Sequence, residues 1–274
     1  MKKPKITLLI TGQFERNLVT NDFLEIIEFQ KKIFKFDNVI CHLWNKEFEQ
    51  IKHLQLPEYI TIIHDEDSMP FNEKLDPFIS EEEQLFHAES ILLSQNQTET
   101  YGTNDTKPAV FSSFKQLYAI SRISDFALEN CDSDIYIRSR YDNKYFLSPN
   151  YPELNQYLNS DKPVIFVPKS HINYSLPDIC YIMNKSAMEN SKNYFNICRN
   201  YSLNNRVFWP ENCLRFHANN AKKVICYRFN FPCYVHRWFK DVKDYNCRNF
   251  PFAKITRDVK SFKPSGIRTA DYIL

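Results

Sequence analysis

Residues 135–143, with the sequence IYIRSRYDN, carry the densest set of chemically capable side chains in the chain. Two alternating isoleucines at the start predict a buried strand. The strand runs directly into polar groups, and charged side chains are costly to hold in a core unless they are paired or bind something. In open α/β folds, ligands bind beyond the carboxyl ends of strands. The segment therefore predicts a site for an anionic ligand, formed by Arg138, Arg140, Asp142 and Asn143.

Arginine and aspartate in this pattern indicate phosphate chemistry. Strand alternation would place Arg138, Arg140 and Asp142 on one face if the strand extends that far. Arginines bridge phosphates in a bidentate manner, and a carboxylate beside a diphosphate can hold Mg²⁺ or Mn²⁺, because hard cations prefer oxygen ligands. A sugar nucleotide fits this description. The alternative is an Arg–Asp ion-pair network that only stabilises the end of the strand.

A second group follows the first predicted strand, at Thr11, Gly12 and Gln13, with Arg16 three residues further on. Such a turn can bring an arginine close to a pyrophosphate, beside the backbone amides at the start of a helix. The alternative is an ordinary strand-to-helix turn with a surface arginine.

Two carboxylates are candidates for a general base. Asp178 opens an apolar strand after a proline, although an acid there is also typical of a turn or a cap. Glu211 follows Pro210 and could deprotonate a sugar hydroxyl. The alternative for Glu211 is a plain helix start, where proline and a carboxylate are both favoured.

The composition argues against several common nucleotide-binding classes. The chain contains 3 glycines, too dispersed for the GxGxxG fingerprint of dinucleotide oxidoreductases or for a Walker loop. The same shortage disfavours a methyltransferase that uses S-adenosylmethionine. The 8 cysteines include no CxxC pair and are expected to be free, mostly buried thiols. If a nucleotide binds, side chains must do the work that glycine loops do elsewhere.

The hydrophobic pattern predicts an α/β fold with a mostly parallel sheet, because strands alternate with helices at the start of the chain. Residues 95–107 predict a polar loop, either inert or an active-site lid. The last residues are basic with few regular signals, which predicts a tail. Strands are expected at residues 6–10, 38–44, 59–63, 135 onward, 163–167, 178–183 and 224–227, and helices at 21–36, 110–128, about 186–198 and 210–217.

Charge and hydropathy indicate where the protein works. No run of 18 apolar residues occurs, and the basic N-terminus is followed by a strand-length apolar run without a cleavage pattern, so we expect a cytoplasmic protein. Residues 222–268 contain 12 Lys/Arg against 3 Asp. This basic quarter could face phosphates or an anionic membrane surface; the alternative is a solvated face.

The order of these elements resembles bacterial and some viral glycosyltransferases of the GT-A-like type, which build capsular and lipopolysaccharide sugars. The resemblance covers about residues 5–235. It rests on a Gly-x-x-x-Arg turn from Gly12 to Arg16, CHLWN at 41–45, QLY at 116–118, RSRYD at 138–142 and PEN at 210–212. The resemblance lies in the order of these elements along the chain.

The resemblance implies a single GT-A-like domain over residues 1–239, followed by a basic extension at 240–274. Residues 1–147 would form a Rossmann-like half that binds the nucleotide sugar, and residues 148–239 would bind the acceptor. The reaction would move a sugar from a UDP-, GDP- or CMP-type donor to a surface glycan or lipid-linked acceptor, with peripheral membrane contact through the basic segment and no nucleic-acid partner.

The resemblance also implies roles for individual residues. Thr11, Gly12, Gln13 and Arg16 would cradle the nucleotide. Asp142 would be the carboxylate nearest the diphosphate and its Mn²⁺ or Mg²⁺. Because Asn143 follows Asp142, the chain has no Asp-x-Asp pair, and Arg138 or Arg140 could neutralise the leaving diphosphate instead. Two other functions stay open: a non-catalytic sugar- or nucleotide-binding module, and a glycan-pathway methyltransferase using S-adenosylmethionine.

Overall fold

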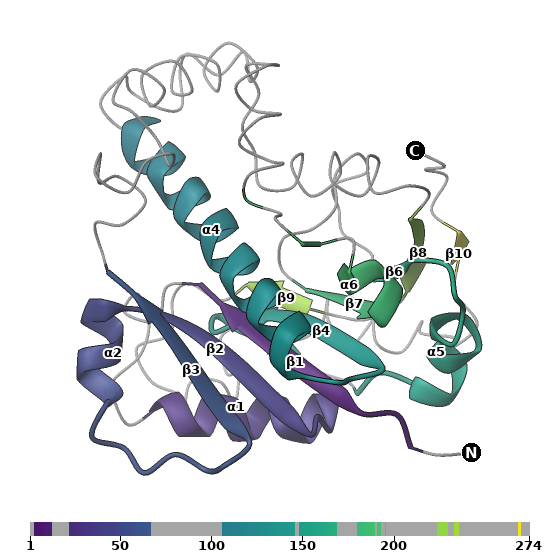
Figure 1. The fold of residues 1–274 in the computed structure, drawn as a ribbon, viewed down its shortest axis with the longest axis horizontal. Coiled ribbons are helices and arrows are strands. Elements are labelled where there is room, and N and C mark those ends of the chain that lie inside the picture. Colours follow the sequence, from purple (N-terminus) through teal and green to yellow (C-terminus); the bar gives the residue numbers. More distant parts are fainter. Residues whose placement is uncertain are drawn as a thin grey trace, which may run out of the picture.

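The fold centres on one large mixed sheet, whose strands run in the order β10-β8-β6-β7-β4-β1-β2-β3 (Figure 1). The computed structural model describes residues 3–12, 22–66, 106–145, 148–168, 180–189, 191–192, 195, 224–229, 233–235 and 268–269. A second, two-stranded sheet pairs β5 with β9. The strands are β1 (Ile6–Thr11), β2 (Asn38–Trp44), β3 (Ile60–Asp65), β4 (Ile135–Arg140), β5 (Asn143–Tyr145), β6 (Val164–Pro168), β7 (Tyr181–Asn184), β8 (Ile225–Phe229), β9 (Cys233–Val235) and β10 (Arg268–Thr269).

The large sheet is mostly parallel, as predicted. β3, β2, β1, β4, β6 and β8 run in the same direction, whereas β7 and β10 run against their neighbours. The antiparallel β7 lies between β4 and β6, so it divides the parallel strands into two groups. The predicted fold class, an α/β domain with a mostly parallel central sheet flanked by helices, is confirmed.

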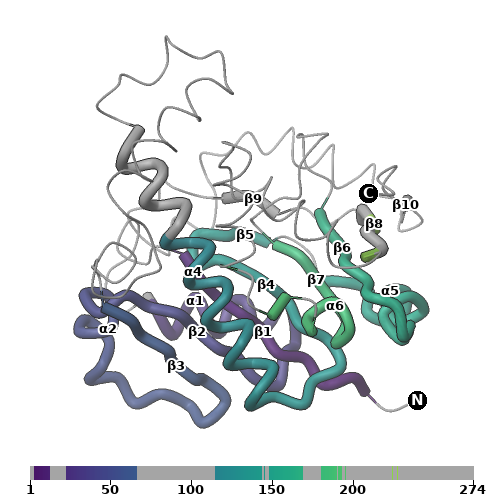
Figure 2. Tube along the Cα trace, turned by 45° about the horizontal axis from the view of Figure 1, so that its top comes forward, coloured from purple at the N-terminus to yellow at the C-terminus, as the bar shows by residue number. Residues whose placement is uncertain are grey.

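Helices cover both faces of the sheet. The helices α4 (Thr106–Asn130) and α6 (Lys185–Glu189) pack on one face, and α1 (Asp22–Phe34), α2 (Asn45–Ile51) and α5 (Tyr151–Leu158) contribute to the core on the other. α4 crosses in front of the sheet and α1 lies behind it (Figure 1). The turned view shows α2 and β3 at one end of the molecule and α5 at the opposite end (Figure 2).

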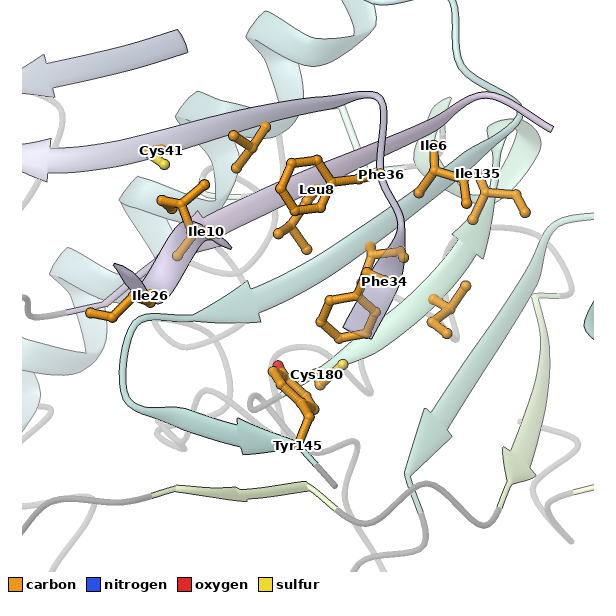
Figure 3. Packing of buried hydrophobic residues seen from close by; sticks show 14 of the residues in the cluster. Ile6, Leu8, Ile10, Ile26, Phe34, Phe36, Cys41, Ile135, Tyr145 and Cys180 are labelled. Carbon is orange, nitrogen blue, oxygen red and sulfur yellow. The ribbon is translucent and has the colours of Figure 1, made fainter. Parts of the chain in front are cut away.

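The core on the α1 face shows why the local sequence forms these elements. Leu8 and Ile10 alternate along β1 toward this face, and α1 contributes Ile26 and Phe34 (Figure 3). Phe23 joins the same core from α1 at helical spacing. Each of these side chains is at most 3% exposed. Full burial of one such side chain stabilises the fold by about 1.5–3 kcal/mol. Packing therefore favours the strand at β1 and the helix at α1, because these conformations bring the apolar side chains to one face.

The ends of the predicted elements agree closely with the structure where packing is regular. β2 spans the residues predicted for it, and α1 begins one residue later and ends two residues earlier than predicted. Lys35 ends α1, because it adopts the left-handed conformation with φ of 51° and its amide donates to the carbonyl of Lys31. α4 is longer than predicted at both ends.

Several predicted segments differ from the structure. A helix, α2, lies in the connection between β2 and β3, where no helix was predicted, and the Glu47 carboxylate stabilises its first turn by accepting from the Trp44 amide at 3.0 Å. Of the helix predicted at about 186–198, the structure describes α6, which ends at Glu189, and Phe195, which is again helical, while most of the other residues beyond Glu189 lie outside the described ranges. The amides of Ser191 and Lys192 donate to the carbonyls three residues before them, as in a 3₁₀ turn. β5, β9, β10 and α5 were not predicted, and β10 lies within the expected tail.

Other predictions cannot be compared. The helix at 210–217 and nearly all of the loop at 95–107 lie outside the described residues. Within the described ranges, none of the helices combines the length and apolar character needed to cross a membrane.

Candidate functional site

The candidate site lies where the chain changes direction across the sheet. β1 is flanked by β2 on one side and β4 on the other, so the connections leave β1 first toward β2 and β3 and later return to place β4 on its opposite side. Both β2 and β4 are parallel to β1, which brings their carboxyl ends to one edge. Ligands of open α/β sheets bind at such a switch point. The first two predicted groups, at Thr11–Gly12 and at Arg138–Asn143, meet there.

The pairing of β1 with β4 places both arginines on the α4 face of the sheet. Leu9 is opposite Arg138 and Thr11 is opposite Arg140 in the register. Leu9 packs in the α4-side core, and alternation puts the other three side chains on the same face. Thr11 and Arg138 are wholly buried, and within the described part of the chain the Thr11 hydroxyl has no hydrogen-bond partner. A buried hydroxyl of that kind can donate to a ligand oxygen.

Arg138 is among the largest fully buried side chains of the described residues, and its Nη1 donates to the carbonyl of Ser139. A guanidinium stays protonated in proteins, and removing its charge from water is costly. An anion beside β4 would lower that cost. The structure places Arg138 near the end of β4, as expected, and its role in binding an anion stays a prediction.

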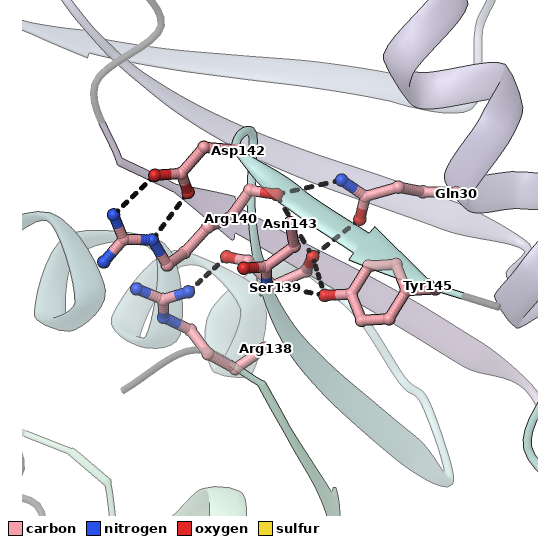
Figure 4. A network of polar contacts seen from close by, with 7 residues as sticks. All are labelled: Gln30, Arg138, Ser139, Arg140, Asp142, Asn143 and Tyr145. Atoms are coloured by element: carbon pink, nitrogen blue, oxygen red, sulfur yellow. Dashed lines mark hydrogen bonds and ion pairs between the residues drawn. The ribbon is translucent and has the colours of Figure 1, made fainter. Parts of the chain in front are cut away.

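Arg140 and Asp142 form a bidentate ion pair (Figure 4). Arg140 Nε lies 2.7 Å from Asp142 Oδ1, and Nη2 lies 2.8 Å from Oδ2. β4 ends at Arg140, so the strand alternation does not extend to Asp142. The turn between β4 and β5 instead directs the Asp142 carboxylate back toward Arg140. The geometry of this segment is therefore that of the Arg–Asp ion pair given above as its alternative.

Gly12 is the residue at which β1 must turn. Its φ of +124° is a backbone conformation that residues with a Cβ rarely adopt. A Cβ added there would meet Arg140 Cβ at 3.7 Å, an ordinary contact, so the requirement for glycine comes from the backbone and not from space. The turn therefore brings the β1 backbone close to Arg140. Gln13 and Arg16, predicted to complete this cradle, lie outside the described residues.

A directed chain of buried hydrogen bonds supports the end of β4 from the α1 side (Figure 4). The Ser139 hydroxyl donates to Gln30 Oε1 at 2.7 Å, so Tyr145 must donate to Ser139, whose oxygen lies 2.6 Å away. Asn143 Nδ2 donates to the Tyr145 oxygen at 2.7 Å. Gln30 Nε2 then donates to the carbonyl of Arg140 at 3.0 Å. Because Gln30, Ser139 and Tyr145 each both donate and accept, the bonds strengthen one another.

A divalent cation does not fit the described residues as they stand. These residues contain no group of three or more His, Cys, Asp or Glu side chains that could hold a metal. Asp142, the predicted metal ligand, directs both carboxylate oxygens at Arg140. A hard cation needs several oxygen ligands, so Asp142 could offer one carboxylate only by giving up Arg140.

A second polar cluster joins the end of β3 to α4. The buried His42 places Nε2 3.0 Å from Asp65 Oδ2, and Arg122 Nε donates to the same oxygen at 3.2 Å. Burial lowers the pKa of His42, although the bond to Asp65 opposes this. Burial alone would raise the pKa of Asp65, but the bonds from His42 and Arg122 together lower it.

Sequence reasoning missed Gln30 and the partnership of His42 with Asp65. Gln30 occupies the buried stripe of α1 and is fully buried there, so a polar residue among regularly spaced apolar ones was the available signal. His42 and Asp65 lie near the carboxyl ends of adjacent strands, and that coincidence was the corresponding signal. The two candidate bases, Asp178 and Glu211, lie outside the described residues, so their roles stay predictions.

No family model matches the chain, and no curated protein matches it. Among solved structures, it is similar to a glycosyltransferase involved in glycosylation of the major capsid of PBCV-1, at 11% identity and a TM-score of 0.35, covering 75% of this chain and 77% of that one. The 4-diphosphocytidyl-2C-methyl-D-erythritol synthase of Anaerococcus prevotii gives 13% identity and a TM-score of 0.41, covering 93% and 99%. A Bacillus anthracis structure, described as a putative glucose-1-phosphate thymidylyltransferase in complex with sucrose, gives 10% identity and a TM-score of 0.43. The match covers 90% of this chain and 96% of that one. At these values the likenesses assign no activity to this chain.

Proposed function

We propose that this protein is a GT-A-like glycosyltransferase that moves a sugar from a nucleotide-sugar donor to a glycan or lipid-linked acceptor. The observation that carries the proposal is the meeting of Gly12, Arg138 and Arg140 at the switch point of the sheet. Two guanidinium groups beside a glycine turn suit a diphosphate, because arginine matches phosphate oxygens in a bidentate manner.

The proposed chemistry follows from charge. The bond between the sugar's anomeric carbon and the diphosphate oxygen breaks while an acceptor hydroxyl bonds to that carbon. Negative charge then develops on the leaving diphosphate, and preorganised cations near it lower the barrier. Arg138 and Arg140 supply that stabilisation in this proposal. A divalent metal, if the complete site holds one, would supply the same kind of charge. Either Asp178 or Glu211 takes the proton from the acceptor hydroxyl.

The remaining residues and regions take roles in keeping with this chemistry. Thr11 and Gly12, with Gln13 and Arg16, cradle the nucleotide. Residues 1–147 form the donor half, 148–239 the acceptor half, and the basic extension at 240–274 lies beside a phosphate-bearing or lipid-linked acceptor at the inner face of a membrane. Capsular or lipopolysaccharide sugars are the proposed products, made in the cytoplasm.

A thermal-shift panel tests donor binding. UDP, GDP, CDP and CMP, their sugar forms and S-adenosylmethionine are each added with and without Mn²⁺, because a ligand that binds only the folded state raises Tm. We expect one nucleotide class to stabilise the wild-type protein and to lose most of that effect in Arg140→Met. Lys185→Met, which removes an exposed charge paired with Asp132, is the control and should respond like the wild type.

A transfer assay with the radiolabelled sugar form of the stabilising nucleotide then separates the alternatives. Transfer or donor hydrolysis supports the proposal, and loss of either in Glu211→Gln or Asp178→Asn, with donor binding retained, identifies the base. Binding without turnover would instead indicate the binding module. Stabilisation by S-adenosylmethionine alone would overturn the assignment in favour of a methyltransferase.

A further inference from the structure

The ion pair between Arg140 and Asp142 has the geometry of a bound ligand. The two carboxylate oxygens face Nε and Nη2 at 2.7 and 2.8 Å, two parallel charge-assisted bonds. A phosphate group binds arginine through the same kind of fork. Asp142 therefore occupies an edge of the guanidinium that a diphosphate would use.

Asp142 is held by little else. Among the described residues, Arg140 is the one partner that its carboxylate has, through the two bonds above. Its neighbours are firmly anchored, since the buried Tyr141 donates to the carbonyl of His42 at 3.0 Å and Asn143 donates to Tyr145. The turn is therefore fixed by its flanking residues, and the Asp142 side chain can leave Arg140 without unfolding it.

From this arrangement we propose that Asp142 is an internal competitor for the anion site. Its carboxylate occupies Arg140 in the ligand-free protein, satisfies the charge of a largely buried guanidinium, and is displaced when a diphosphate binds. The idea rests on the proposed function only in naming the diphosphate of a sugar nucleotide as the anion that takes its place.

A competitor and a metal ligand predict opposite changes in donor binding when Asp142 is replaced. Removing a metal ligand weakens donor binding. Removing a competitor strengthens it, because the incoming anion no longer has to displace a carboxylate from Arg140. Because the diphosphate must replace the Asp142 carboxylate, the site binds it more weakly than it would without that carboxylate. The weaker binding favours release of the product.

The test is isothermal titration with inorganic pyrophosphate, without metal, on wild type and Asp142→Asn. We expect the Kd of Asp142→Asn to fall at least about tenfold, the scale of one hydrogen bond to a charged group. Asp132→Asn, which removes an exposed carboxylate paired with Lys185, is the matched control and should bind pyrophosphate like the wild type. An unchanged or higher Kd in Asp142→Asn overturns the inference.

A measurement on the wild type covers the case in which the variant fails to fold. The ¹³C resonance of the Asp142 carboxyl, assigned through its own amide, should move on pyrophosphate addition as the carboxylate leaves Arg140. A resonance that stays in place while pyrophosphate binds contradicts the exchange.

The two proposals fail in different ways. If Asp142→Asn binds pyrophosphate more tightly but neither protein binds any nucleotide sugar, the competitor role holds and the proposed donor is wrong. If the wild type binds and transfers from a nucleotide sugar but Asp142→Asn binds pyrophosphate more weakly, the proposed function holds and the competitor role is wrong.

Discussion

Replacing Ser139 by alanine should destabilise the protein through hydrogen bonds, with little loss of packing. The Ser139 hydroxyl is the middle member of the buried chain that runs from Asn143 through Tyr145 to Gln30. Without it, Gln30 Oε1 loses a donor and the Tyr145 hydroxyl loses an acceptor. Ser139 and Gln30 are fully buried, and Tyr145 is 2% exposed, so water cannot easily take the vacated place.

The expected loss follows from these two groups. A buried donor or acceptor left without a partner costs about 1–3 kcal/mol, so two of them cost about 2–6 kcal/mol of the free energy of unfolding. That would be a large fraction of the roughly 5–15 kcal/mol typical of a folded domain. The Arg140 carbonyl accepts from the same Gln30 side chain, so the end of β4 should also become less rigid.

The assay is urea unfolding followed by circular dichroism, with linear extrapolation to zero denaturant. Ser133→Ala is the matched control, because Ser133 is also buried but its hydroxyl shares a bond of 2.7 Å with Thr7 away from the site. We expect Ser133→Ala to cost about half as much, since one group and not two loses its partner. In a Gln30→Met background the cost of Ser139→Ala should shrink, because one of the two stranded groups is gone.

Two results would refute this reasoning. A cost of Ser139→Ala no greater than that of Ser133→Ala would show that the chain of bonds adds nothing. Alternatively, the cost could stay the same in the Gln30→Met background, which would show that the two side chains are not coupled.

Two further substitutions test the structure. Burial lowers the pKa of His42 below its ordinary 6.5, so as the pH falls below 6.5 the unfolded chain takes up the proton first and the free energy of unfolding should decline. His42→Gln should decline less over the same interval in urea unfolding at a series of pH values, and equal slopes would contradict the assignment. Gly12→Ala should cost about 1–2 kcal/mol because of its φ of +124°, and should weaken pyrophosphate binding beside Arg140. An unchanged Tm and an unchanged Kd together would show that the turn tolerates a Cβ.

Local periodicity determined much of the fold. The apolar runs of β1 and β2, the alternation at the start of β4 and the helical spacing in α1 and α4 could be recognised from the sequence, because each pattern depends on neighbours a few residues away. The same local pattern predicted that Arg138 and Arg140 stand at the end of a strand. Short elements such as α2 and β5 were not predicted, because so few residues show no clear hydrophobic periodicity.

Tertiary structure decided how these elements are combined into a site. Ser139 and Gln30 are 109 residues apart, and Arg122 and Asp65 are 57 apart, so no local pattern identifies them as partners. The order of strands that places β1 between β2 and β4 also depends on long-range pairing. Residue types near Asp142 were compatible with either a metal ligand or an ion pair. The end of β4 at Arg140 decided the geometry, because a strand would have carried Asp142 onward whereas a turn brings its carboxylate back to the arginine.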